Sequence, residues 1–200
     1  MNEPPHIAAP AGNNWDNSIL EPLAELNLEV LDALARAPEG SSWRWRALGD
    51  DARARLAHCP FLLVDLGAAR PQLWSGASRV GVHEARPVSA LLAQRGPLAT
   101  PLLRRVLLFA WHLARANRLA ARITLGMDAR CAALVAACRF ADLEALAERR
   151  PEWIRPRWHD RPEVWQAWLG AAAEESPRSL ENLRLWGLQM LAAEVLGRGA

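Results

Sequence analysis

Apolar residues recur at three- and four-residue intervals along most of the chain, which is the spacing of one face of an α-helix. Most of these stretches begin at proline or at a residue that caps helices, and most end at glycine or before proline. The pattern predicts helices over residues 19–36, 52–58, 87–94, 101–125, 129–138, 141–149, 162–173 and 178–196. We therefore expect an all-α fold, a compact multi-helix bundle.

Two apolar stretches carry more specific expectations. Residues 61–66 are too few for periodicity to separate a strand from a helix. We interpret them as a helical turn or a buried extended piece, because no partner strand is evident elsewhere. The helix over 178–196 is expected to be amphipathic, with one buried face formed by Leu180, Leu183, Leu185, Leu188, Met190, Leu191 and Val195.

A short sequence pattern, which we call the echo, occurs twice and divides the chain. Leu56-Ala57 is followed by Arg70-Pro71 and Trp74, and about 90 residues later Leu146-Ala147 is followed by Arg161-Pro162 and Trp165. Proline suits the first turn of a helix in both copies. The echo predicts two related helical units. We expect a disordered N-terminal segment over 1–17, a first helical unit with its linker over 18–86, and a second helical unit with a C-terminal helix over 87–200.

Composition narrows the function classes. All 24 cationic residues are arginine, but the net charge is only +2, so a strongly basic nucleic-acid-binding domain is not indicated. The N-terminus lacks the pattern of a signal peptide, and no apolar run reaches the roughly 20 residues that span a bilayer. An odd count of three cysteines fits a reducing compartment. We expect a cytoplasmic protein that does not insert into membranes.

Catalytic and metal-binding patterns do not emerge from the sequence. Cys131 and Cys138 lie on one predicted helix, about 10.5 Å apart along its axis, too far to share a metal ion or a disulfide. Cys59 with a distant histidine is an unspecific nucleophile pattern. Glycine-rich phosphate loops, HExxH and GxSxG are missing from the sequence. We expect a non-enzymatic protein with no metal and no cofactor.

Binding to another molecule is the remaining class of function. The segments 128–138 and 140–149, which contain two of the predicted helices, have helix-turn-helix proportions, although a plain helical hairpin fits them as well. Tryptophan and arginine alternate over 43–46, which suits base stacking or, more simply, a loop held to the core. The candidate DNA-binding residues are Arg115, Arg118, Arg122, Arg149, Arg150 and Arg155. Four tryptophans, which are candidate partner-binding residues or core anchors, are Trp153, Trp158, Trp165 and Trp168.

A set of small and apolar residues in the second unit resembles a known family. The set comprises Leu125-Gly126, Ala132-Ala133, Ala136-Ala137, Leu143, Leu146-Ala147-Glu148 and Arg157. Over Leu119–Trp158 it lines up without gaps with the D subunit of the flagellar master transcription regulator, FlhD. In the first unit the residues that resemble the family are Asn27-Leu28, Leu31, Ala35-Arg36, Leu56-Ala57 and Phe61–Leu66. Family members are about one unit long, so the doubling, the proline-rich connection and the terminal helix of this chain depart from them.

The resemblance implies an α-helical, oligomer-forming regulator that acts on promoter DNA together with a partner subunit, usually a zinc-bearing one. This chain has no cysteine cluster that could serve as the zinc site of that partner. A second interpretation is an all-α cytoplasmic adaptor of a type III secretion or motility apparatus, since accessory proteins of the SctK kind are similar in length and in their leucine, tryptophan and proline content. Both interpretations include a protein partner and leave a homo-oligomer open.

Overall fold

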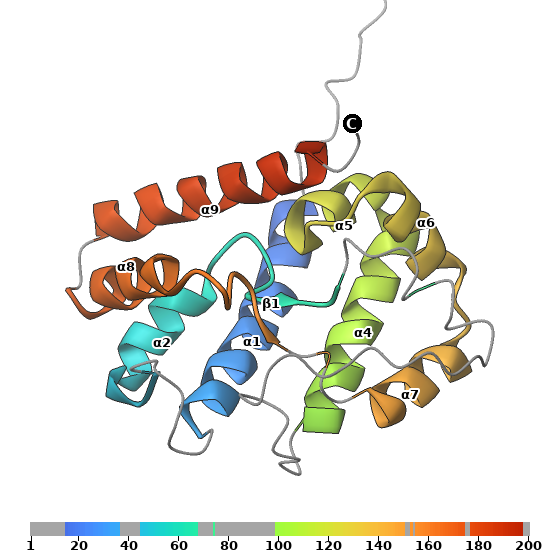
Figure 1. The fold of residues 1–200 in the computed structure, drawn as a ribbon, viewed down its shortest axis with the longest axis horizontal. Coiled ribbons are helices and arrows are strands. Elements are labelled where there is room, and N and C mark those ends of the chain that lie inside the picture. The colour runs from blue at the N-terminus through green and yellow to red at the C-terminus, as the bar shows by residue number, and fades with distance from the viewer. Residues whose placement is uncertain are drawn as a thin grey trace, which may run out of the picture.

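A computed structural model of the chain describes residues 15–36, 45–67, 74, 99–150, 153, 155–174 and 177–197. Within these residues the fold is all-α, as the sequence predicts, with eight α-helices, one short 3-10 helix and a ladder of two-residue strands (Figure 1). The predicted helix over 87–94, the residues 68–86 before it except for Trp74, which hold the expected linker, and the first fourteen residues lie outside the described residues.

The N-terminal half begins with the helix α1, Trp15–Ala35, which starts three residues inside the segment expected to be disordered. A 3-10 turn, η1, covers Trp45–Ala47, and α2 covers Asp50–Ala57, close to the predicted helix over 52–58. Asp50 and Asp51 lie in the first turn of α2, where carboxylates offset the positive end of the helix dipole. The strand β1 follows at Val64–Asp65.

The long helix predicted over 101–125 is instead two helices. α4 covers Ala99–Ala116 and α5 covers Arg118–Leu125, with Asn117 between them in an extended conformation. The Asn117 side chain accepts a hydrogen bond from the Ala120 N–H at 3.0 Å, which caps the start of α5. Asparagine offers the backbone this alternative to a continuous helix, and the break turns α5 away from the axis of α4.

Five further elements complete the described chain. α6, Ala129–Ala137, is capped by Asp128, whose side chain accepts a hydrogen bond from the Cys131 N–H at 2.6 Å. α7 covers Phe140–Arg149, β2 covers Arg155–Pro156, α8 covers Pro162–Ala173 and α9 covers Pro177–Gly197. These bounds agree with the predicted helices within a few residues. They confirm the helical pattern of the second half of the chain.

Residues 61–66 form a buried extended segment, the second of the two interpretations offered by the sequence. Its partner strand does exist, because β1 pairs antiparallel with β2, with Val64 opposite Pro156. A strand of two residues that contains a proline gives no period-2 pattern, which explains why the sequence did not reveal it. The segment joins parts of the chain that are about ninety residues apart.

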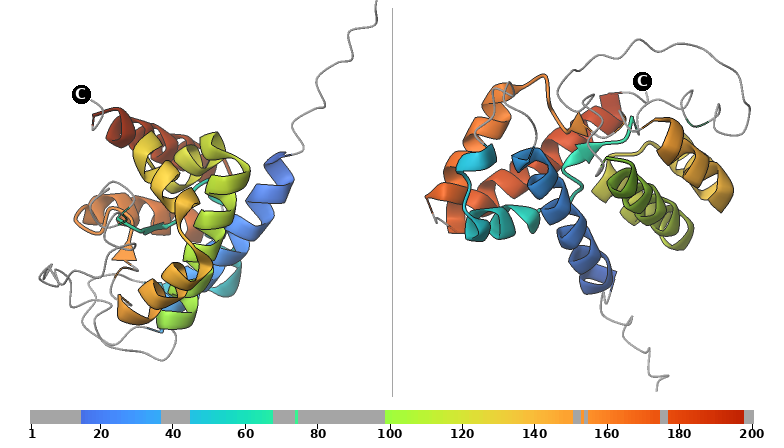
Figure 2. Two further views of the ribbon diagram at one scale, coloured as in Figure 1. Left: turned by 90° about the vertical axis from the view of Figure 1, so that its right-hand side faces the viewer. Right: turned by 90° about the horizontal axis from the view of Figure 1, so that it is seen from below.

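The helices gather in two groups around a shared core. α1 and α4 pack against each other in the middle, α2, α8 and α9 cover one side, and α5, α6 and α7 pack on α4 at the other (Figures 1 and 2). One hydrophobic cluster runs through all of these helices. The two predicted units therefore do not form separate cores. Their internal relationship stays a prediction, since residues 70–73 of the first copy lie outside the described residues.

Candidate interaction surfaces

The structure places three of the candidate partner-binding tryptophans in the core. Trp158, Trp165 and Trp168 are buried, and their rings pack with those of Trp45 and Phe61. The Trp165 indole N–H donates to the Arg157 carbonyl at 2.6 Å, and that of Trp158 donates to Glu194 on α9 at 2.7 Å. The sequence left two roles open for these tryptophans, partner binding and anchoring the core. These three residues are core anchors, and they offer no surface to a partner in this fold.

Trp45, Trp74 and Trp153 also pack against other aromatic rings. Trp45 is buried with its ring centroid 4.5 Å from that of Trp165, so it holds its loop to the core rather than stacking on bases. Trp153 is half-buried and meets the ring of buried Trp74 edge to face at 5.8 Å. Aromatic contacts therefore account for most of the tryptophan content of the chain.

The six candidate DNA-binding arginines do not share one surface. Arg155 forms an ion pair with Asp65 at 2.9 Å, and both side chains are largely shielded from solvent. Burial by itself would raise the pKa of Asp65, but the charges of Arg157 and Arg155 and the hydrogen bonds from Arg155 and the Gly67 N–H outweigh it and hold that pKa below its usual value. Arg155 is therefore largely shielded and paired with Asp65, so its assignment to a DNA-binding surface gains no support from the structure.

The remaining five arginines fall into two groups. Arg104, near the start of α4, pairs with Glu144 at 2.8 Å and with Glu148 at 3.5 Å, so the end of α7 lies beside the start of α4. Arg149 and Arg150, which follow Glu148 at the end of α7, therefore lie toward the start of α4. Arg115 lies eleven residues further along α4, about 16 Å along the helix axis. The cluster Arg115, Arg118 and Arg122 is thus separated from Arg149 and Arg150 by most of the length of α4.

The first group belongs to what we name the α5 surface, formed by Arg115, Arg118, Leu119, Arg122 and Ile123. Leu119 is 62% exposed and Ile123 is 44% exposed, one helical turn apart. Arg118 and Arg122 are also one turn apart, and the Arg115 guanidinium lies over the Trp111 ring at 4.8 Å. The helical pattern did not indicate that Leu119 and Ile123 are exposed, because the apolar period predicts one continuous helix over 101–125. Asn117, as a potential cap, was the available signal.

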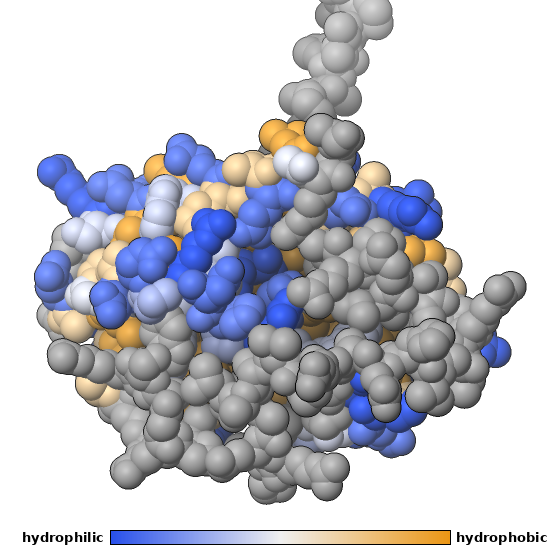
Figure 3. Space-filling model, viewed as in Figure 1, coloured by the Kyte–Doolittle hydropathy of each residue, from blue (hydrophilic) through white to orange (hydrophobic). Residues whose placement is uncertain are grey.

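A second exposed feature is the α9 strip, which we define as Leu185, Trp186 and Leu196. Leu185 is 55% exposed and Leu196 is 73% exposed, so the prediction that Leu185 lies on the buried face of this helix is wrong. α9 packs on the core through Leu180, Gly187 and Leu191 instead. Apolar residues lie along the upper edge of the molecule, where α9 runs (Figure 3).

The signal for the α9 strip was present in the sequence. From Leu185 to Ala193 the helix holds no charged residue. A stretch of nine residues covers two and a half turns, so some of its apolar side chains must face away from any single contact. Large side chains left exposed on such a stretch are a feature of interaction surfaces.

The structure shows where the thiols and the possible metal ligands of the described residues lie. Cys59, Cys131 and Cys138 are all buried, and desolvation raises the pKa of Cys59, against a smaller opposing effect of Arg184. Within the described ranges no group of three or more His, Cys, Asp or Glu side chains is arranged to hold a metal ion. None of the described helices is long and apolar enough to cross a membrane.

Comparison of the chain with known protein families, with curated proteins and with solved structures finds no match. The likenesses to FlhD and to SctK-type accessory proteins therefore stay expectations.

Proposed function

We propose that this chain is a non-enzymatic interaction protein that binds another protein through the α9 strip. The observation that carries the proposal is the exposure of Leu185, Trp186 and Leu196 on one helix whose opposite side is fixed to the core. Each large apolar side chain removed from water contributes about 1.5–3 kcal/mol, so three of them on a rigid helix form an effective binding surface.

The rigidity of α9 supports this proposal. Gly187 lies so close to the Phe61 and Trp168 rings that an added Cβ atom would be 3.0 Å from Trp168. Leu191 packs over Gly126, and the Arg184 guanidinium donates to the Arg55 carbonyl at 2.7 Å. A helix that is held at both halves does not need to reorder when it binds, which lowers the entropic cost of association.

Within this proposal, the setting that we favour is an adaptor of a bacterial type III secretion or motility apparatus, acting in the cytoplasm. An adaptor needs exposed apolar surface and no DNA-binding face. The scattered arginines support an adaptor over a DNA-binding regulator, since one is paired with Asp65 and two lie at the far end of α4.

Capture from extracts of the native cell tests this function. The tagged wild-type chain is compared with Leu185→Gln/Leu196→Gln and with a control, Ala167→Gln, at an exposed position of α8. We expect a protein that the wild type and the control retain and that the α9 variant loses by about tenfold or more. An unchanged set of bound proteins, with circular dichroism showing that the variant is folded, contradicts the proposal.

The FlhD-like regulator is the second candidate, and Arg115, Arg118 and Arg122 are the observation that favours it. DNA binding by the α6–α7 hairpin has less support, because α7 carries Asp142, Glu144 and Glu148 against Arg149. A gel shift with duplex DNA separates the two candidates. A DNA-binding regulator loses affinity by orders of magnitude between about 50 and 200 mM salt, whereas the adaptor forms no complex even at low salt.

A further inference from the structure

We infer that the α5 surface is a second docking site, and that its occupant is an acidic amphipathic helix of a partner protein. The inference does not depend on α9, because it rests on different residues and on charge rather than on apolar exposure alone. Together the two surfaces would let the chain hold two partners at once.

The charge of this region is one-sided. Between Arg105 and Arg139 the chain carries four arginines, at positions 115, 118, 122 and 130, and one carboxylate, Asp128. That carboxylate is already used, since it caps α6 by accepting from the Cys131 N–H. Among the described residues, none of the four arginines forms an ion pair, and the buried Nε of Arg122 has no hydrogen-bond partner.

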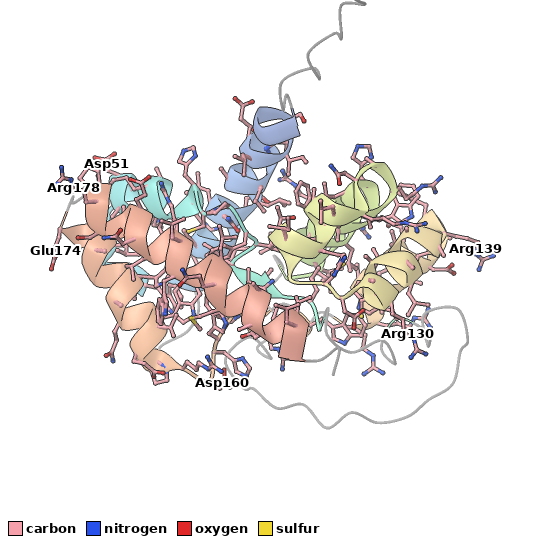
Figure 4. All side chains as sticks on the ribbon, turned by 90° about the horizontal axis from the view of Figure 1, so that it is seen from above. Asp51, Arg130, Arg139, Asp160, Glu174 and Arg178 are labelled. Atoms are coloured by element: carbon pink, nitrogen blue, oxygen red, sulfur yellow. The ribbon has the colours of Figure 1, made fainter. Side chains whose placement is uncertain are left out.

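Arg130 lies toward one end of the molecule (Figure 4). Seen from above, Arg130 and Arg139 point outward on the side of α6 and α7, whereas Asp51, Glu174 and Arg178 lie at the opposite end (Figure 4). Arg139 is neutralised by Asp142 in an exposed pair at 2.9 Å. Within the described part of the chain, Arg115, Arg118, Arg122 and Arg130 carry positive charge without an ion pair, and they would attract an anionic partner.

The exposed apolar residues of the α5 surface indicate which kind of anionic partner fits it. Leu119 and Ile123 alternate with Arg118 and Arg122 on α5, and all four side chains reach solvent. A nucleic-acid backbone offers phosphates but leaves such aliphatic side chains uncovered. An acidic amphipathic helix offers both negative charge and an apolar stripe. Its carboxylates four residues apart repeat at about 6 Å, which is the spacing of Arg118 and Arg122. Its apolar stripe can cover Leu119 and Ile123.

Fluorescence anisotropy of the full chain with defined probes tests the inference. The probes are a panel of labelled helical peptides of about five turns, each with a leucine stripe flanked by glutamates and each in a different register. Shuffled peptides of the same composition, peptides with glutamine for glutamate, a duplex DNA and vesicles of phosphatidylserine with phosphatidylcholine complete the set.

Three variants accompany the wild type. Arg118→Glu/Arg122→Glu reverses the charge of the surface, and Leu119→Ser/Ile123→Ser removes its aliphatic part. The matched control Arg149→Glu/Arg178→Glu makes the same change in net charge at exposed positions away from α5. Circular dichroism verifies that each variant is folded.

The inference predicts that at least one acidic amphipathic peptide binds the wild type, and that both α5 variants weaken it about tenfold or more. The control should change the affinity less than about twofold, and high salt should weaken binding. The inference is overturned if no peptide of the panel binds, if shuffled peptides bind equally, or if the control loses as much as the α5 variants. Tighter binding of DNA or of vesicles with the same arginine dependence would also overturn it, by assigning the surface to that ligand.

Discussion

The side chains of Asn27 and Arg157 both form hydrogen bonds with the backbone of one buried segment, residues 61–64. Asn27 donates to the Phe61 carbonyl at 3.0 Å and accepts from the Leu63 N–H at 2.9 Å. Arg157 donates to the carbonyls of Leu62 and Val64 at 2.9 and 3.1 Å. The whole segment is buried with only one short strand beside it, so side chains supply the partners that a sheet would otherwise provide.

Asn27→Ala is therefore expected to destabilise the fold strongly. The substitution removes hydrogen bonds to the Phe61 and Ala57 carbonyls and to the Leu63 N–H, all of them buried. Each buried group left without a partner costs about 1–3 kcal/mol, so the free energy of unfolding should fall by about 3 kcal/mol or more. Urea denaturation measures it. Asn182→Ala, at an exposed position of α9, is the control, and an equal effect of both substitutions would contradict the account.

Two glycine-to-alanine substitutions should change the free energy of unfolding in opposite directions. A Cβ atom at Gly187 would meet the Phe61 and Trp168 rings, whereas one at Gly170 would meet nothing within 4 Å. Gly187→Ala should cost about 1–3 kcal/mol through overpacking. Gly170→Ala, on an exposed position of α8, should gain about 1 kcal/mol through helix propensity. Thermal unfolding of the two variants measures this. A stabilising Gly187→Ala would show that α9 is not packed as described.

Acid should weaken the fold through Asp65. The pKa of Asp65 is lower in the folded chain than in the unfolded one, so its stabilising effect is fully present above about pH 4. It is lost as the pH falls through the folded-state value, since protonation then favours unfolding. Asp65→Asn should lower the stability at neutral pH and flatten the acid limb of the stability profile. Asp51→Asn, an exposed change, should leave that limb unaltered, and a wild-type profile that is flat below pH 4 would refute the assignment.

The three thiols should resist modification in the native state. Burial raises the pKa of Cys59 and of Cys138, which lowers the fraction of reactive thiolate, and Cys131 is fully buried. We expect slow reaction with a disulfide reagent near pH 8 and reaction of all three thiols in urea. Ala133→Cys, at an exposed position of α6, should add one fast-reacting thiol and serves as the positive control. Rapid labelling of the native wild type would contradict the burial of these cysteines.

Local signals in the sequence were sufficient for most helices. Pro162 and Asp128 mark helix starts that the structure confirms. The break at Asn117 was missed because the apolar period continues through it, and the exposed aliphatic residues Leu119 and Ile123 of α5 were not singled out. The β1–β2 ladder was missed because its two strands are two residues long.

The candidate sites were harder to predict than the helices. Composition revealed many tryptophans and arginines, but burial depends on tertiary contacts. Trp165 lies in the core through its contact with Trp45, which is far away in the sequence. Arg155 pairs with Asp65, ninety residues earlier. No local pattern encodes either contact, so their roles could be assigned only from the structure.

Site-specific photocrosslinking in the native cell tests the central proposal most directly. A photoreactive phenylalanine analogue replaces Trp186 on the α9 strip or, as the control, Glu163 at an exposed position of α8. The account predicts that position 186 forms an adduct with one discrete protein other than this chain, and that position 163 does not. Adducts that are missing from position 186, are equal at both positions, or contain only a second copy of the chain would contradict it.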